Sequence, residues 1–253
     1  MWKCPPSTVL VPVDFGEASA RALAVASALA SRVGARIRVL HAEVIEAPPY
    51  FTHEQLATIE RERKAARAKA VQFVLEFARA HGVGQCEVAI AEGSPTAAIV
   101  QAAGQADLVV MGTHGRHGPG RWWMGSVAER VVHDTGTPVL VVRADLGGLA
   151  PEQVFDRPLV IAPQGAQGEA NRMAAALAQA FGGQVVDTVV ACEADLAQSR
   201  HATLMVVSKA GTGQASRLNH TEHWLRSCAL PMLFVPSDPV SSSSTTVVQG
   251  GVS

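Results

Sequence analysis

The chain has 253 residues, of which 48% are hydrophobic and 17% are charged, and its formal net charge is −1. These values favour one large or two small globular domains, and they argue against a disordered chain and against a duplex nucleic-acid binder, which usually has a basic face. The four cysteines are scattered and include no C-x-x-C pair, so we expect neither a disulfide framework nor a thiolate zinc site. There is no signal-like N-terminus and no apolar run near the roughly 20 residues of a membrane span, so we expect a cytoplasmic protein without membrane insertion.

The first half alternates short apolar runs with helical patterns. The predicted strands are Thr8–Val13, Arg36–Ala42, Glu87–Ala91, Leu108–Met111 and Val139–Val142. The predicted helices are Glu17–Arg32, Glu54–His81, Pro95–Ala103 and Val127–His133. Strands that alternate with helices pair in parallel, so the sequence predicts a doubly wound α/β domain over residues 1–143.

A glycine- and proline-containing break at residues 144–157 is interpreted as an interdomain linker. Beyond it, the pattern of the first half returns in the helix Glu169–Phe181 and in the strands Leu159–Pro163, Val185–Ala191, Ala202–Val207 and Pro231–Val235. The offset between matching segments falls from about 150 to about 95, so about 53 residues are missing after the second strand of the repeat. We therefore expect a second, reduced α/β domain at 158–236 that packs on the first with pseudo-two-fold symmetry, followed by a disordered tail at 237–253.

The strongest chemical signal is Met111-Gly112-Thr113-His114-Gly115, followed after nine residues by Gly125-Ser126. Glycines directly after a buried strand let the chain turn sharply and let a ligand approach the backbone. Ser126 is a good N-cap for the next helix, and the unpaired amides at a helix start bind phosphate. Arg116, His117 and Arg121 could add positive charge to this loop.

The second signal is Pro12-Val13-Asp14, at the carboxyl end of the first strand. A carboxylate there can accept hydrogen bonds from a sugar or a base. In open α/β sheets, ligands lie beyond the carboxyl ends of the strands where the chain order reverses. If the first and fourth strands are neighbours, Asp14 and the glycine loop share one crevice.

The pattern G-x-x-G, nine residues, G-[ST] resembles the nucleotide motif of the ATP-binding universal stress proteins. Val9–Asp14, Ala106–Gly115 and Gly93-Ser94-Pro95 are similar to other blocks of that family. The resemblance covers residues 7–143 well and 158–236 weakly. It implies a universal-stress-protein-like (adenine nucleotide alpha hydrolase-like) α/β fold, with strand order 3-2-1-4-5 in the first domain.

The resemblance also implies a set of ligand-contacting residues. Asp14 would contact adenosine, the backbone around Val13 and Ala42 would flank adenine, and the glycine loop would line the ribose and phosphates. The full set of binding candidates is Pro12, Val13, Asp14, Ala42, Met111, Gly112, His114, Gly115, Arg116, Gly125, Ser126 and Val127. The alternative is that the glycines only make a turn and that Asp14 caps the following helix.

The second half lacks this motif. Gln164 aligns with Asp14, Ser208 with Gly112, and Leu218-Asn219 with Gly125-Ser126, while Gly211 is retained opposite Gly115. Backbone approach and phosphate binding at the helix start are both compromised. The sequence therefore predicts no nucleotide site in the second half.

The expected function is a stress-response binding module regulated by ATP, with AMP and ADP as alternatives and Mg²⁺ able to accompany the nucleotide. A slow ATPase or phosphate-transferring enzyme, and a regulatory subunit of a membrane transporter, remain open as alternatives. The sequence has no P-loop motif, and no catalytic residue is assigned. No metal ligand is assigned either, because two histidines, His220 and His223, are too few for a zinc site. The partners expected are the nucleotide and, beyond the pseudo-dimer, a further homodimer.

Overall fold

The computed structural model describes residues 3–43, 53–113, 125–162, 168–186, 188–190, 202–209 and 230–236. Side chains are described in these ranges except at 53–63, 161–162 and 188–190. Several residues of the sequence analysis lie outside the described residues: His114, Gly115 and Arg116, Gln164 of the second half, and the tail at 237–253.

The first half contains the elements that its periodicity predicts. They are β1 (Thr8–Pro12), α1 (Glu17–Val33), β2 (Arg36–Glu43), α2 (His53–Ala80), β3 (Glu87–Glu92), α3 (Pro95–Ala103), β4 (Leu108–Gly112), α4 (Ser126–Asp134) and β5 (Val139–Val142). α1 ends where Gly34 adopts the left-handed conformation, with φ of 70°, a backbone shape that glycine adopts without strain.

The second half begins with two short 3₁₀ helices and continues with strands around one described helix. Its elements are η1 (Leu146–Gly148), η2 (Pro151–Gln153), β6 (Pro158–Ala162), α5 (Gly168–Ala180), β7 (Thr188–Val190), β8 (Leu204–Lys209) and β9 (Met232–Pro236). All the predicted strands and helices are present, and their ends differ from the predicted ends by at most three residues.

The strands form one nine-stranded sheet in the order β3-β2-β1-β4-β5-β9-β8-β6-β7. The order 3-2-1-4-5 of the first half is confirmed. The sequence predicted two parallel sheets, and the structure joins them, because β5 pairs antiparallel with β9 through Val139↔Phe234 and Leu140↔Leu233. Every other pairing among the described strands is parallel.

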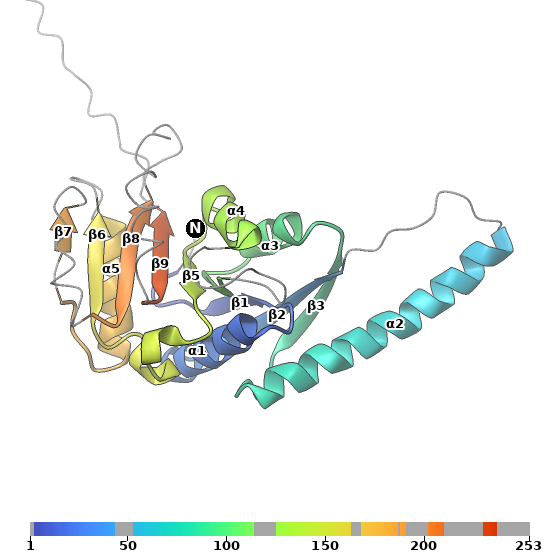
Figure 1. Ribbon diagram of the computed structural model, residues 1–253, viewed down its shortest axis with the longest axis horizontal. Coiled ribbons are helices and arrows are strands. Elements are labelled where there is room, and N and C mark those ends of the chain that lie inside the picture. Colours follow the sequence, from blue (N-terminus) through green and yellow to red (C-terminus); the bar gives the residue numbers. More distant parts are fainter. Residues whose placement is uncertain are drawn as a thin grey trace, which may run out of the picture.

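Helices cover both faces of this sheet, so the molecule has three layers (Figure 1). Alternate strand residues face opposite sides: Val9 and Val11 contact the cluster that contains α1, α2 and α5, whereas Leu10 contacts the cluster that contains α3 and α4. The N-terminal part of α2 extends beyond the edge of the sheet (Figure 1). None of the helices in the described part of the chain has the length and hydropathy that a bilayer span requires.

The segment between the halves, residues 144–157, is anchored in the core by three buried side chains. Leu146, Val154 and Phe155 are fully buried in the same cluster as residues of both halves. The ring of Phe155 lies 4.9 Å from that of Phe181 at the end of α5, measured between centroids. The two halves therefore share one continuous hydrophobic core on this face of the sheet.

Candidate functional site

The predicted binding site would lie beyond the carboxyl ends of β1 and β4. These strands are neighbours, with Val9 paired to Leu108 and Leu10 to Val109. From β1 the sheet continues outward to β2 and β3, and from β4 it continues in the other direction to β5. This reversal is the place where open α/β sheets bind ligands, and it brings the two sequence motifs together.

At the end of β1 the backbone is held by β2. The Val13 amide donates to Leu40 O at 2.8 Å, and Nδ1 of His41 lies 2.8 Å from Val13 O, to which it donates in the Nδ1–H tautomer. Oδ1 of Asp14 accepts a hydrogen bond of 3.0 Å from the amide of Gly16, the N-cap residue of α1. Asp14 therefore has a structural role at the start of α1, and its carboxylate lies at the positive end of that helix.

At the end of β4, Gly112 is in tight contact with α1. A Cβ atom there would lie 2.7 Å from Ala18 Cβ and 3.0 Å from the Ser19 amide nitrogen. Glycine is thus required at this position by helix packing, which is a different reason from the ligand approach inferred from the sequence. Its absent side chain allows the first turn of α1 to lie against the end of β4.

The start of α4 is tied to the end of β4. The Thr113 amide donates to Val142 O at 2.8 Å, and the Gly125 amide donates to Thr113 O, which closes the segment 114–124 at its base. Ser126 is the first helical residue and Gly125 is the N-cap, so the predicted N-cap role of Ser126 is wrong. Because Gly125 has no side chain to accept from the first turn of α4, these amides are left for another acceptor.

Ala42 lies at the end of β2, on the strand next to β1. It pairs with Ala91 of β3 and is half-buried. Val127 is also half-buried, whereas Pro12 and Met111 are buried in their strands. The described candidates therefore lie near the carboxyl ends of three adjacent strands, β2, β1 and β4, and at the start of α4.

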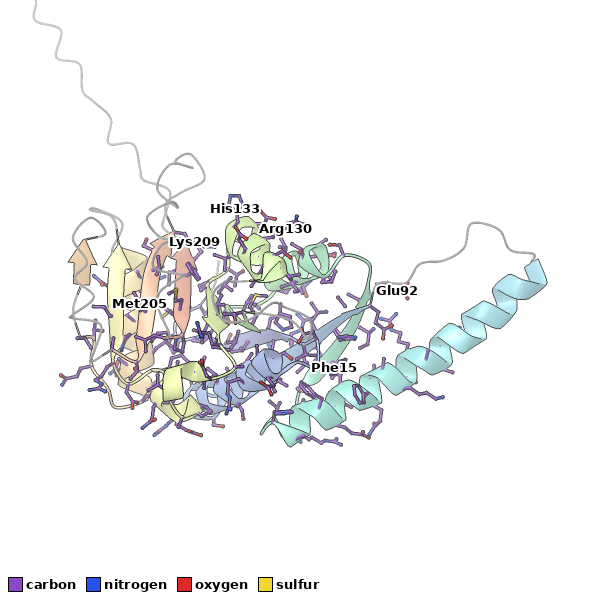
Figure 2. The ribbon with its side chains drawn as sticks, in the orientation of Figure 1. Phe15, Glu92, Arg130, His133, Met205 and Lys209 are labelled. Atoms are coloured by element: carbon purple, nitrogen blue, oxygen red, sulfur yellow. The ribbon has the colours of Figure 1, made fainter. Side chains whose placement is uncertain are left out.

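Sequence reasoning missed an aromatic cluster beside Asp14. The ring centroid of Phe15 lies 4.6 Å from that of His41, 4.7 Å from Phe73 and 5.2 Å from Phe77. Phe15 has a positive φ of 64°, which is uncommon for a bulky residue. Figure 2 shows Phe15 between α1 and α2. The spacing of Phe73 and Phe77 on one face of a predicted helix was the available signal.

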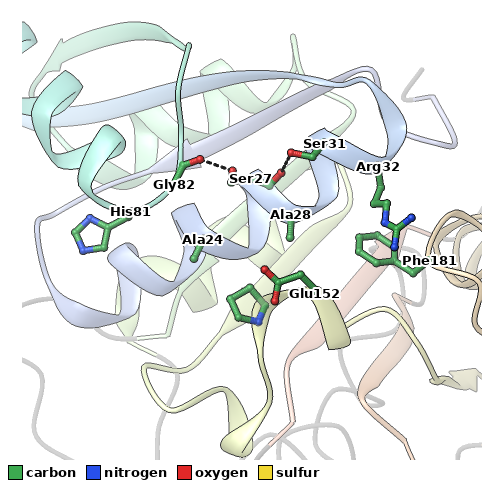
Figure 3. Close-up of a pocket in the computed structure, with 10 residues that line it drawn as sticks. Ala24, Ser27, Ala28, Ser31, Arg32, His81, Gly82, Glu152 and Phe181 are labelled. Atoms are coloured by element: carbon green, nitrogen blue, oxygen red, sulfur yellow. Dashed lines mark hydrogen bonds between the residues drawn. The ribbon is translucent and has the colours of Figure 1, made fainter.

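A separate cavity of about 390 Å³ lies on the outer side of α1, away from the strand ends (Figure 3). It is lined by Ala24, Ser27, Ala28, Ser31, Arg32, His81, Gly82, Pro151, Glu152 and Phe181. The hydroxyl of Ser27 donates to Gly82 O at 2.6 Å, and that of Ser31 donates to Ser27 O at 2.9 Å. The hydrogen atoms of both hydroxyls are therefore donated to backbone carbonyls inside the protein.

The sequence assigned no metal-ligating residue. Within the part of the chain that the structure describes, no three His, Cys, Asp or Glu side chains form a group that could hold a metal ion. The histidines considered for zinc, His220 and His223, lie outside that part.

Comparison with known proteins places the first half in a family. The sequence model of the Universal stress protein family matches residues 6–143. The "Universal stress protein in QAH/OAS sulfhydrylase 3′region" of Thermus aquaticus is 37% identical over 138 residues, which are 54% of this chain and 98% of that protein. Universal stress protein YxiE of Bacillus subtilis (strain 168) is 30% identical over 149 residues, covering 53% of this chain and 97% of the relative.

The fold of the whole chain also has a counterpart. The crystal structure of a universal stress protein from Archaeoglobus fulgidus DSM 4304 superposes with a TM-score of 0.67 at 20% identity, covering 91% of this chain and 98% of that one. This likeness concerns the fold and includes the second half. The family model matches more than half of the residues, and the chain therefore belongs to the universal stress protein family.

Proposed function

We propose that this universal stress protein binds an adenine nucleotide, ATP, at the carboxyl ends of β1 and β4, and that it acts in the stress response as a nucleotide-dependent regulatory module. The observation that carries the proposal is the hydrogen bond from the Gly125 amide to Thr113 O. It brings the first turn of α4 to the end of β4, next to the strand that leads to Asp14. A helix start with available amides attracts phosphate, and a nearby carboxylate suits a sugar hydroxyl.

The candidate residues divide into two groups under this proposal. Asp14 and the backbone near Val13 and Ala42 would contact adenosine. Because the Val13 amide and carbonyl are both engaged by β2, Val13 would contribute van der Waals contact. The phosphate-side residues would be Gly112, Gly125, Ser126 and Val127, with His114, Gly115 and Arg116 of the glycine loop.

We propose that the second half takes the place of a second subunit. Outward from the antiparallel pair β5–β9, the order β5-β4-β1-β2 on one side corresponds to β9-β8-β6-β7 on the other. A two-fold axis through that pair would produce this arrangement from two copies of one domain. The substitutions Gln164 and Leu218-Asn219 argue that this half binds no nucleotide.

The test is isothermal titration of ATP, ADP and AMP into the protein, with and without Mg²⁺, at pH 7. We expect one site per chain in the wild type. Ser126→Asp places a carboxylate on the exposed first turn of α4, where it favours the helix dipole but repels phosphate, so ATP should bind at least tenfold more weakly while the protein stays folded.

Gln101→Glu is the control. It adds the same charge at an exposed position in the last turn of α3, and the Kd for ATP should stay unchanged. Equal effects of the two variants, or no binding by the folded wild type, would contradict the proposal. Two sites per chain would contradict only the loss of the second site. Steady Mg²⁺-dependent release of phosphate would change the assignment to an ATPase.

A further inference from the structure

A lysine of the second half contacts the helix whose start forms the proposed phosphate site. Lys209 is the last residue of β8, and its Nζ donates hydrogen bonds of 2.8 Å to Val132 O and 2.8 Å to Thr135 O. Both carbonyls belong to the last turn and the C-cap of α4. Figure 2 shows Lys209 at the tip of β8, on the side that faces α4.

The sheet topology explains how Lys209 reaches this position. β9 runs antiparallel to β5 and parallel to β8, so the carboxyl end of β8 lies at the same edge of the sheet as the start of β5. α4 ends at that edge because β5 follows it directly in the chain. Lys209 also has the same strand parity as Met205 and Val207, which face the α3–α4 layer.

The chemistry of the contact suits the end of a helix. The last carbonyls of an α-helix lack partners within the helix and lie at the negative end of its dipole, where a cation is favourable. The basic residue in the last turn of α4, His133, is exposed, and its ring contacts Asp134 at 2.7 Å. Burial lowers the pKa of Lys209 to about 8, so at pH 7 its amine is still mostly protonated.

The equivalent position in the first half gives this contact a functional context. By the sequence correspondence of the repeats, Lys209 matches Thr113, the residue that begins the glycine loop. In the second half, the strand end that would begin a nucleotide loop instead holds α4 of the first half.

We propose that Lys209 is a positioning residue of the nucleotide site, which holds the carboxyl end of α4 and thereby sets where the first turn of this helix lies. The inference rests on the proposed function. α4 has nine residues, a rod of about 13 Å, so a shift at one end is carried to the other. Ala128, Val131 and Val132 pack one side of α4 into the core. The hydrogen bond to Thr113 ties its start, and the bonds from Lys209 tie its end.

The experiment compares ATP binding by titration calorimetry and amide hydrogen exchange of residues 126–134 at pH 7. Lys209→Met keeps most of the aliphatic chain and removes the ammonium group, and Lys209→Arg keeps the cation. Val206→Ala, on the opposite face of the same strand, controls for lost stability, and Lys69→Met, on an exposed position of α2, controls for lost charge.

We expect Lys209→Met to raise the Kd for ATP about fivefold or more and to speed exchange in the first turn of α4 as well as in the last. Lys209→Arg should restore most of the affinity, and both controls should keep the wild-type Kd. A wild-type Kd in Lys209→Met, or an equal loss in Val206→Ala, would overturn the role of Lys209 and leave the proposed function intact. If the wild type binds no nucleotide, the proposed function and this role are both overturned.

Discussion

Gly112 lies so close to Ala18 that a Cβ atom on Gly112 would be 2.7 Å from Ala18 Cβ. The same Cβ atom would also come too close to backbone atoms of Ala18 and Ser19 in α1. Rotating a side chain therefore cannot relieve the contact. The first glycine of the G-x-x-G motif is therefore a packing residue between α1 and β4.

Gly112→Ala should lower the free energy of unfolding by about 1–3 kcal/mol, because α1 must move away from β4. Urea denaturation measures this change. Gly136→Ala is the control, since a Cβ atom there meets nothing within 4 Å and the loss should be near zero. Equal stability of the two variants would show that α1 shifts at no cost and that the contact is not restrictive.

Removal of the Phe15 ring should loosen α2. Phe15→Ala deletes the contacts with His41, Phe73 and Phe77, and we expect a loss of about 2–4 kcal/mol together with faster amide exchange in residues 70–80. Phe73 is 54% exposed, so Phe73→Ala should cost less than about 1.5 kcal/mol. If exchange in residues 70–80 is unchanged in Phe15→Ala, the cluster does not hold α2.

Asp107 should make the protein sensitive to acid. Burial alone would raise the pKa of this carboxyl, but hydrogen bonds from the Ser7 hydroxyl and from the amides of Lys3, Ser7 and Thr8 outweigh it and lower the pKa. A lowered folded-state pKa gives stability that is present above the unfolded value of 3.8 and is lost as pH falls through the folded value.

Asp107→Asn should therefore cost about 2 kcal/mol at pH 7, and the difference from wild type should shrink as pH falls below 3.8. Urea titrations between pH 2.5 and pH 7 provide the measurement. A difference that is the same at both ends of this range would mean that the charge of Asp107 does not contribute.

Lys209 should affect stability at alkaline pH. Burial lowers the pKa of its amine from 10.5 to about 8. Between these values the folded protein loses a proton that the unfolded chain keeps, so the free energy of unfolding contributed by this residue rises with pH. The stability of wild type minus that of Lys209→Met should increase on the order of 3 kcal/mol from pH 8 to pH 10.5.

The same urea series on both proteins cancels the titration of the other lysines. A difference that stays flat or falls over this range would mean that the carbonyls of Val132 and Thr135 hold the amine charged and offset the effect of burial.

The sequence by itself determined the elements of this protein and the location of its candidate site. Period-2 and helical patterns, with stops such as Gly34, are local properties, and each strand and α-helix that they predicted is present with its ends within three residues of the prediction. The 3₁₀ helices η1 and η2, in the segment interpreted as a linker, were not predicted. The alternation of strands with helices predicted parallel pairing, and the resemblance to a known family implied the strand order of the first half. If the first and fourth strands are neighbours, as the structure shows, Asp14 and Gly112 lie at the ends of adjacent strands.

Only the tertiary structure decided how distant residues meet. The pairing of β5 with β9 merges two predicted sheets into one, and it alone brings Lys209 to α4, more than 70 residues earlier in the chain. The contacts of Phe15 with α2 and of Gly112 with Ala18 also join residues that are far apart in the sequence. Local periodicity shows which face of an element is apolar, but the partner of that face is chosen by packing across the whole molecule.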